Sequence, residues 1–385
     1  MLARVEHARF GDLVLTGPSA VSHDPADLES SGTWAVVVTF EGELTAVRFD
    51  RVTTGDPPPV GPWFPPAGTW SSSMTKGQYV AGVERVRQHI AAGDVYQVNL
   101  CRVMSADLPA EAHLPALAPL LEAGNPAPYA GVVHTPSAGI DVVTASPEAY
   151  LLRDGDRVVS RPIKGTGRIP ADLGAKDHAE NVMITDLVRN DLSHVALPGT
   201  VDVEALCTLE EHPGLLHLTS DVAARLRPGT TWAEILEASF PPGSVSGAPK
   251  SSALRIIGEL EGGPRGPYCG AIGWVDADAR RAQLAVGIRT FWAEGEGGAR
   301  TLHFGTGAGI TWGSDPSREW DETELKASRL VAIASGSVEG QGQSRARASR
   351  RPDGRGPRRG RGGGDETYQW IRLSPSGHSR SHRKP

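Results

Sequence analysis

Hydrophobic positions recur at helical spacing in one segment of the chain and at strand spacing in the next. Residues 76–92 place four apolar side chains on one stripe of an amphipathic helix: Tyr79, Val83, Val86 and Ile90. A Gly-Asp pair at 93–94 would end this helix, and residues 95–103 then alternate in the manner of a strand. The pattern predicts a helix that leads directly into a strand.

The two faces of that strand differ in polarity. The more apolar face carries Tyr96, Val98 and Leu100. The other face carries Val95, Gln97, Asn99 and Cys101. Buried amides need hydrogen-bond partners, so the second face either lines a polar cavity or lies exposed on a half-hydrated sheet. The sequence is compatible with both interpretations.

A hairpin is predicted further along the chain. Two β-rich runs, residues 142–152 and 157–163, flank the dipeptide Asp154-Gly155, which is favoured in tight turns. Pairing about this dipeptide would place Glu148 directly opposite Arg161.

Lys164 follows the second run, in the segment 162–166 (Pro-Ile-Lys-Gly-Thr). The expected register places it about one diagonal from Glu148. An amine that has lost its proton is a nucleophile on carbon, and a neighbouring carboxyl can serve it as an acid. The alternative is a cross-strand salt bridge at the surface, which contributes about 0.5 kcal/mol.

Two pairs of acidic residues stand three positions apart. A predicted helix over residues 176–192 carries Asp177 and Glu180, and a later segment carries Glu319 and Glu322. At this spacing both members of a pair project from one helix face. Such faces can supply oxygen ligands to Mg²⁺, which takes only one or two carboxylates, or they can be solvated surface.

Glycine is dense between the two acid pairs, in segments 242–250, 268–270 and 305–309. Glycine lets backbone N–H groups approach an anion closely. The run at 305–309 lacks the ending of a phosphate loop and the spacing of a dinucleotide loop. Arg289 follows an apolar run, and a buried arginine usually has an anionic partner, either structural or a substrate carboxylate.

The net charge of −6 is divided unevenly along the chain. Residues 340–385 contain twelve Lys or Arg and three Asp or Glu, a net +9, so the remaining 339 residues carry −15. This Arg/Gly-rich tail lacks apolar periodicity, and we expect it to be disordered. It is either an RNA-binding arm or a solvated extension, and the acidic body disfavours binding to nucleic acid.

The rest of the composition is that of a globular protein. The chain has 385 residues, 39% of them hydrophobic, and no apolar run reaches the roughly 20 residues of a membrane helix. Its three cysteines show no metal-binding spacing, and so low and odd a number suits the reducing cytoplasm.

Taken in order, these motifs resemble those of the chorismate-utilising enzymes over roughly residues 74–332. The matching segments are Gly93–Leu100, Ser146–Glu148, Pro162–Thr166, Glu180–Ile184, Asp186–Asp191, His217, Ser244–Lys250, Tyr268–Gly270, Gly307–Gly309 and Glu319–Lys326. Within the family, the chain resembles most the large synthase component of aminodeoxychorismate synthase.

The resemblance implies an α+β fold, with two large antiparallel sheets packed together and helices outside. Residues 1–73 would be a short N-terminal portion of this fold, and residues 74–335 the chorismate-binding catalytic domain. The first 73 residues are short for the family and lack its Leu-Leu-Glu-Ser segment, which lines a tryptophan pocket.

The resemblance also implies roles for individual residues. Glu180 and Glu322 would bind Mg²⁺ directly, and Asp177 and Glu319 through water. Glu148 would protonate the departing C4 hydroxyl. The remaining residues would line the chorismate pocket: Gln97, Thr166, His217, Ser246, Tyr268, Arg289, Gly307 and Lys326.

Two positions distinguish the reactions within the family. Members that add water at C2 have a lysine base where this chain has Gln97, and a neutral amide cannot deprotonate water. Anthranilate synthases, which add ammonia at C2, usually have alanine where this chain has Lys164.

With lysine present, the resemblance implies that Lys164 attacks C2, the C4 hydroxyl leaves, and ammonia enters at C4 and displaces the lysine. The product would be 4-amino-4-deoxychorismate, the precursor of p-aminobenzoate and folate. Lys164 must then be neutral near pH 7, about three units below its reference pKa, which desolvation can achieve. Anthranilate synthase component I, or supply of the product to a specialised metabolite, are the alternatives.

None of the three cysteines lies in a nucleophile-elbow sequence. We therefore expect ammonia to come from solution or from a separate glutamine amidotransferase subunit.

Overall fold

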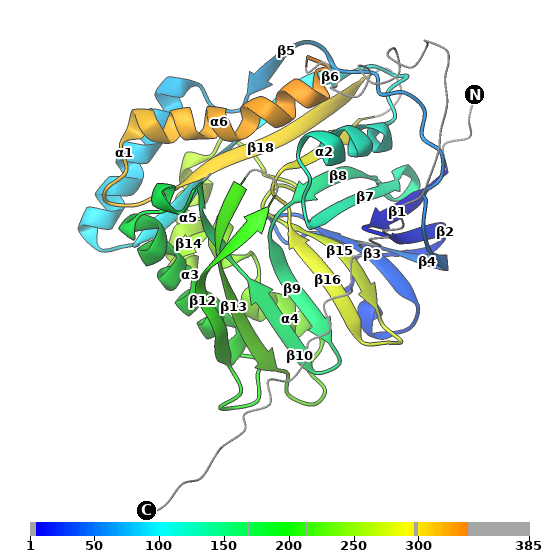
Figure 1. Cartoon of the computed structure of the whole chain (residues 1–385), viewed down its shortest axis with the longest axis horizontal. Coiled ribbons are helices and arrows are strands. Elements are labelled where there is room, and N and C mark those ends of the chain that lie inside the picture. Colours follow the sequence, from blue (N-terminus) through cyan, green and yellow to red (C-terminus); the bar gives the residue numbers. More distant parts are fainter. Residues whose placement is uncertain (1–4, 168, 213–214, 296–298, 338–385) are drawn as a thin grey trace, which may run out of the picture. The chain divides into compact units, whose positions relative to one another are not determined.

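The computed structural model describes residues 5–167, 169–212, 215–295 and 299–337, which belong to one compact unit (Figure 1). The tail predicted to be disordered, residues 340–385, lies outside the described residues, and so does the side chain of Thr166. In the part of the chain that is described, no helix is long and apolar enough to cross a membrane.

Within the described residues, eighteen strands form one hydrogen-bonded sheet, and neighbouring strands pair antiparallel. The first half, in order of pairing, is β12 (Asp202–His212), β13 (Leu215–Arg225), β10 (Arg157–Arg161) with β11 (Ile163–Gly167), β9 (Ala149–Asp154), β16 (Arg281–Val286), β15 (Ala271–Asp276), β3 (Thr33–Val38) and β4 (Leu44–Thr54). The second half continues with β2 (Leu13–Ser22), β1 (His7–Phe10), β7 (Tyr129–Thr135), β8 (Ile140–Ser146), β17 (Thr290–Glu294), β18 (Arg300–Ile310) and β6 (Gln97–Leu108), which pairs with β5 (Ala67–Ser72) and β14 (Gly247–Ala248).

Helices pack on the outside of this sheet (Figure 1). They are α1 (Lys76–Ala92), α2 (Ala118–Gly124), α3 (Ala175–Ser193), α4 (Trp232–Ser239), α5 (Lys250–Leu260) and α6 (Pro316–Ala334), with short 3₁₀ turns at Pro25–Glu29, Leu114–Leu117, Pro136–Ala138, Pro170–Asp172 and Gly243–Val245. Helix α6 lies along β18, and α3 packs against β11, β12 and β13. The predicted α+β class, with antiparallel sheets and outer helices, is confirmed. The two predicted sheets are the two halves of one continuous hydrogen-bonded sheet.

The predicted helix over residues 76–92 is confirmed as α1. Thr75 caps its N-terminus, and Gly93 ends it in the left-handed conformation, with φ of 84°. The strand that follows begins at Gln97, two residues later than predicted, and continues to Leu108. Tyr96, which the alternation assigned to the apolar face, lies before the strand and is 71% exposed.

Both faces of β6 are buried, which decides between the two interpretations of its polar face. Val98 and Leu100 pack in a core with α1 and α5. Gln97 and Asn99 are also buried, and only 1% of Gln97 is exposed. The polar face of β6 is therefore an interior surface.

The predicted hairpin is wrong in two respects. Residues 142–152 are not one strand, because the chain leaves β8 at Ser146 and begins β9 at Ala149. The closing pair of the turn is Asp154 with Arg157, and a bulge then pairs Arg161 with Ala149. Glu148 is therefore not opposite Arg161. Since β8 belongs to the second half of the sheet and β9 to the first, Glu148 lies where the chain crosses between them.

Candidate active site

Lys164 lies on β11, two residues after Pro162 interrupts the strand that began as β10. Its Nζ donates a hydrogen bond to the backbone oxygen of Ser244 at 2.9 Å. Desolvation lowers the pKa of Lys164, although Glu180 and Glu148 nearby favour its charged form. The pKa shift has the direction that a nucleophilic amine requires.

Lys164 and Gln97 meet at Gly309 of β18. A Cβ on Gly309 would collide with the amide nitrogen of Gln97 and lie 3.5 Å from Nζ of Lys164. The amide oxygen of Gln97 is buried and has no hydrogen-bond partner among the described residues. The predicted polar face of β6 thus presents an unsatisfied amide beside the lysine.

Glu148 is buried, with 4% of its surface exposed. Burial raises the pKa of its carboxyl to about 7, against the opposing influence of Ser244 and Lys164. The carboxyl and the amine are therefore neighbours, as the sequence predicted. The crossover between β8 and β9, rather than cross-strand pairing, brings them together.

Three more of the predicted residues lie on or against β18: Gly307, Lys326 and Tyr268. A Cβ on Gly307 would contact the sulfur of Cys101, and its carbonyl accepts a hydrogen bond from Nζ of Lys326 at 3.1 Å. The ring of Tyr268 packs against Gly305, where a Cβ would overlap it. Ser246 is buried, and its hydroxyl donates to the carbonyl of Pro242.

Arg289 has a left-handed backbone, with φ of 53°, directly before β17. Desolvation lowers the pKa of its guanidinium. Among the described residues, no carboxylate lies within ion-pair distance of it. A desolvated arginine without a protein counter-ion is suited to bind an anion from outside the chain.

The two acid pairs lie on α3 and α6, whose ends approach each other. Burial raises the pKa of Glu180, and Asp177 and Glu322 add to this rise. Burial alone would also raise the pKa of Glu322, but Lys326, 2.7 Å away, together with Lys176 and Lys164, outweighs it and lowers that pKa. The effect of Glu322 on the pKa of Glu180 shows that these two residues, far apart in the sequence, lie near each other.

Lys176 connects the two pairs, a role that was not predicted from the sequence. Its Nζ lies 3.7 Å from Oε1 of Glu180 and 3.8 Å from Oε1 of Glu319. Within the described residues, the acids are not gathered into a preformed metal centre. However, Oε1 of Glu180 is buried without a hydrogen-bond partner, and a cation would satisfy it.

Strand pairing determines the positions of two of the predicted pocket residues. Thr166 of β11 pairs with His217 of β13, which is 1% exposed. Gly309 and the carbonyl of Ser244 also belong to the site and were not named as site residues from the sequence. Both contact Lys164 through long-range packing, so local sequence carries little signal for them.

The sequence profile of a family described as chorismate binding enzyme matches residues 39–332. The chain belongs to this chorismate binding enzyme family. The match includes every residue discussed above as part of the site.

Individual relatives within the chorismate binding enzymes carry two different names. Anthranilate synthase component 1 of Streptomyces coelicolor is 40% identical over 279 residues, which are 69% of this chain and 52% of that protein. Aminodeoxychorismate synthase component 1 of Escherichia coli is 34% identical over 275 residues, 68% of this chain and 58% of that protein. The matched part is thus little more than half the length of these relatives.

A solved chorismate binding enzyme also shares the fold. Anthranilate synthase component I from Streptococcus pneumoniae superimposes with a TM-score of 0.71 at 22% sequence identity, covering 84% of this chain and 92% of that one. The predicted family is therefore confirmed, and the fold with it.

Proposed function

We propose that this chain aminates chorismate at C4 and forms 4-amino-4-deoxychorismate through a covalent bond to Lys164. The observation that carries the proposal is the arrangement of Lys164, with its lowered pKa, beside the buried acid Glu148 and the neutral amide Gln97. Chorismate and ammonia are the proposed substrates.

In the first step, the neutral amine of Lys164 bonds to C2 of chorismate. The ring double bonds shift, the C4–O bond breaks, and Glu148 gives its proton to the leaving hydroxyl, which departs as water. Ammonia then bonds to C4, the double bonds shift back, and the bond between Lys164 and C2 breaks. The net reaction consumes chorismate and ammonia and releases the aminated ring and one water.

Chorismate carries two carboxylates, and Arg289 and the proposed Mg²⁺ would bind one each. Arg289 and Tyr268 would hold the enolpyruvyl carboxylate, with backbone N–H groups near Gly307. Ser246, His217, Thr166 and Lys326 would complete the polar lining of the pocket. Gln97 offers an unpartnered amide oxygen beside the reacting carbons, and it cannot serve as a base for water.

Mg²⁺ is the proposed cofactor, because the acids of α3 and α6 are hard oxygen ligands. Glu180 and Glu322 would bind it directly, and Asp177 and Glu319 through water. When bound, Mg²⁺ would neutralise the ring carboxylate of chorismate. Because these acids are not gathered into a complete site, substrate and water would supply the remaining ligands.

Lys176 should compete with this cation for Glu180 and Glu319. We expect Lys176→Met to tighten Mg²⁺ binding by about 1 kcal/mol, or roughly fivefold, because a positive charge near 4 Å is removed. Isothermal titration calorimetry without chorismate measures this directly. Lys76→Met, which removes an exposed lysine paired with Asp321, is the control. Weaker or unchanged affinity in Lys176→Met would contradict the proposed site.

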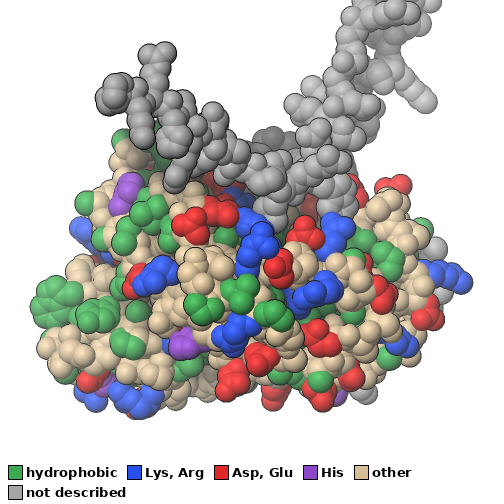
Figure 2. Space-filling model, turned by 90° about the horizontal axis from the view of Figure 1, so that it is seen from below, with side chains coloured by type: hydrophobic (Ala, Val, Ile, Leu, Met, Phe, Trp, Pro, Cys, Tyr) green, Lys and Arg blue, Asp and Glu red, His purple; other side chains and the backbone are tan. Residues whose placement is uncertain are grey.

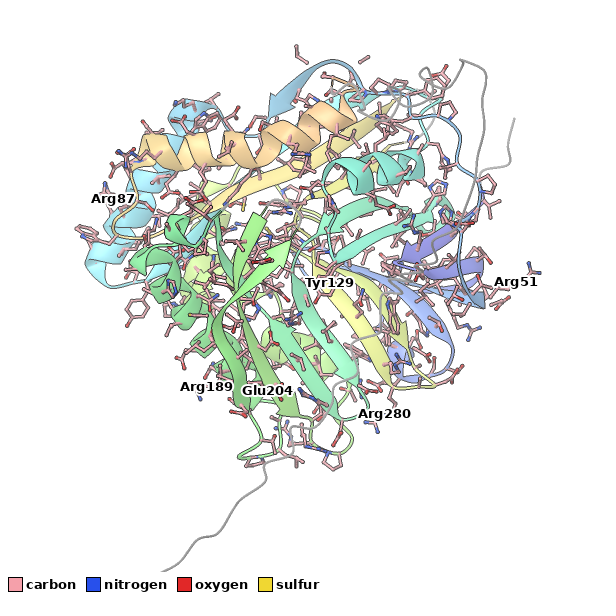
Figure 3. The ribbon with its side chains drawn as sticks, in the orientation of Figure 1. Arg51, Arg87, Tyr129, Arg189, Glu204 and Arg280 are labelled. Atoms are coloured by element: carbon pink, nitrogen blue, oxygen red, sulfur yellow. The ribbon has the colours of Figure 1, made fainter. Side chains whose placement is uncertain are left out.

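Arg289 is predicted to determine the affinity for chorismate. Lysine keeps the positive charge but cannot form the bidentate hydrogen bond of arginine. The loss of about 1.5–3 kcal/mol of binding free energy should raise the KM of Arg289→Lys by roughly 10- to 100-fold. Arg280→Lys is a matched control, because Arg280 also has a positive φ, of 51°, but projects into solvent (Figure 3). An unchanged KM in Arg289→Lys would exclude Arg289 from the substrate clamp.

The reaction itself is tested by product identification. Incubation with chorismate, Mg²⁺ and ammonium salt, followed by mass spectrometry and NMR, should give a ring aminated at C4. Anthranilate is the expected product of the alternative function, which the names of several relatives support. Isochorismate would contradict both.

We further propose that a glutamine amidotransferase subunit supplies the ammonia in the cell, and that the product serves p-aminobenzoate and folate synthesis. A nucleic-acid function is disfavoured by the acidic body. On the face drawn in Figure 2, basic and acidic side chains are interspersed. Measuring RNA affinity against salt, with and without residues 340–385, tests that alternative.

A further inference from the structure

A small cavity lies behind Glu148, bounded by β9, β10, α3 and the segment that precedes α5. Its volume is about 20 Å³, which is enough for one water molecule. The polar residues that line it are Glu148, Ser160, Asp191, Ser239 and Ser244. The rest of the lining is largely apolar, and a cavity of this size with several polar side chains in its wall is suited to one ordered water.

Ser244 touches both the active site and the cavity. Its carbonyl accepts the hydrogen bond from Lys164, and its hydroxyl lines the cavity. That hydroxyl is buried and close enough to the carboxyl of Glu148 to lower its pKa, but it makes no hydrogen bond of normal geometry among the described residues. Buried hydroxyl groups in native proteins are normally satisfied by protein or by water. Water in the cavity would satisfy this one.

An ion pair lies at the other side of the cavity. Lys250 donates to Oδ2 of Asp191 at 2.7 Å and to the carbonyl of Ser239 at 2.9 Å. The side chains of Asp191 and Lys250 are 9% and 17% exposed. The pair therefore reaches from the cavity towards solvent. Neither residue has a role in the proposed chemistry, although burying a charged pair is costly.

We propose that one water in this cavity connects Glu148 to Asp191, and that the Asp191–Lys250 pair returns a proton to Glu148 in each catalytic cycle. This inference rests on the proposed function, in which Glu148 loses its proton to the leaving hydroxyl. Asp191 takes up a proton from solvent and passes it to the water, and the water passes one to Glu148. Only O–H bonds form and break in the relay, which takes one proton from solvent in each cycle. Ammonia releases one proton to solvent after it has bonded to C4, so the net reaction is unchanged.

The relay acts after the C4–O bond has broken. Steps up to the first irreversible one determine kcat/KM, whereas reprotonation limits only the complete cycle. Removing the relay should therefore lower kcat and leave kcat/KM nearly unchanged. A purely structural role for Asp191 would lower both.

Asp191→Asn is the direct test, with chorismate, Mg²⁺ and ammonium as substrates. We expect kcat to fall by about tenfold or more, kcat/KM to stay within about twofold, and the solvent deuterium isotope effect on kcat to increase. Asp186→Asn is the matched control, because it removes the same charge from the exposed side of the same helix. Equal kcat in Asp191→Asn and wild type, or parallel losses in kcat and kcat/KM, would overturn the relay.

Asp191→Asn leaves Lys250 without its counter-ion and can fail to fold. The double variant Asp191→Asn, Lys250→Met removes both charges together, and the same change in kcat is expected from it. Infrared spectroscopy gives a readout without turnover, since the protonated carboxyl of Glu148 has its own band, which Glu148→Gln removes. Hydrogen–deuterium exchange of this band should slow in the double variant, and unchanged exchange would overturn the relay. Because the band needs no substrate, it separates failure of the relay from failure of the proposed reaction.

Discussion

Lys164→Ala is expected to lower the rate of C4 amination by at least about 10³-fold, because the covalent nucleophile is lost. The methyl group of alanine leaves the space beside C2 to ammonia, so a slow formation of anthranilate should accompany the loss. Both products are measured in one chromatographic assay with chorismate, Mg²⁺ and ammonium. The change in product would show that Lys164 selects the reaction and does not merely support the pocket.

Lys76→Ala serves as the control, because Lys76 is an exposed lysine, paired with the exposed Asp321, and has no role in the proposed reaction. A second measurement tests the covalent bond between Lys164 and C2 of chorismate. Wild-type protein mixed with chorismate in the absence of ammonia should gain the mass of chorismate less one water, on the peptide that contains Lys164. Retention of full C4 amination by Lys164→Ala would remove the lysine from the mechanism, whatever its pKa.

The elements that local sequence encodes were predicted well. Helix α1 carries its own cap, its apolar stripe and its terminating glycine, so each signal lies within a few residues of the others. The polar face of β6 could be identified but not assigned to solvent or interior. That assignment depends on β18, which pairs with β6 from about 200 positions away in the sequence.

Long-range geometry explains what the sequence could not provide. The proximity of Glu148 and Lys164 was predicted correctly from a register that is wrong, because Pro147 ends one strand and sends the chain to the other half of the sheet. Lys176 was passed over, since its position between Glu180 and Glu319 follows from how α3 packs relative to α6. Helix spacing shows which acids share a face, whereas only packing shows which faces meet.

Glu148→Gln is expected to lower kcat by about 10²- to 10⁴-fold near pH 6, because the amide fills the same space but has no acidic proton to give to the leaving hydroxyl. The pH dependence follows from the pKa of about 7 in the folded protein, raised from 4.5 by burial. The carboxyl is protonated and active below that pH, and it is ionised above it. In the wild type, this ionisation should therefore lower kcat/KM by about tenfold per pH unit once the pH exceeds both about 7 and the pKa of Lys164.

The ionisation of Lys164 determines the acidic limb of the dependence of kcat/KM on pH. It reacts only when neutral, so its activity rises with pH, and its lowered pKa moves this rise towards neutrality. Glu148→Gln should lose the alkaline fall and keep the acidic rise, which assigns each limb to one residue. Glu84→Gln, an exposed glutamate of α1 paired with Arg87, should keep both limbs. If kcat/KM of Glu148→Gln still fell above about pH 7, the acid that protonates the leaving hydroxyl would be another group. The next group to test would then be Glu180, whose pKa burial also raises.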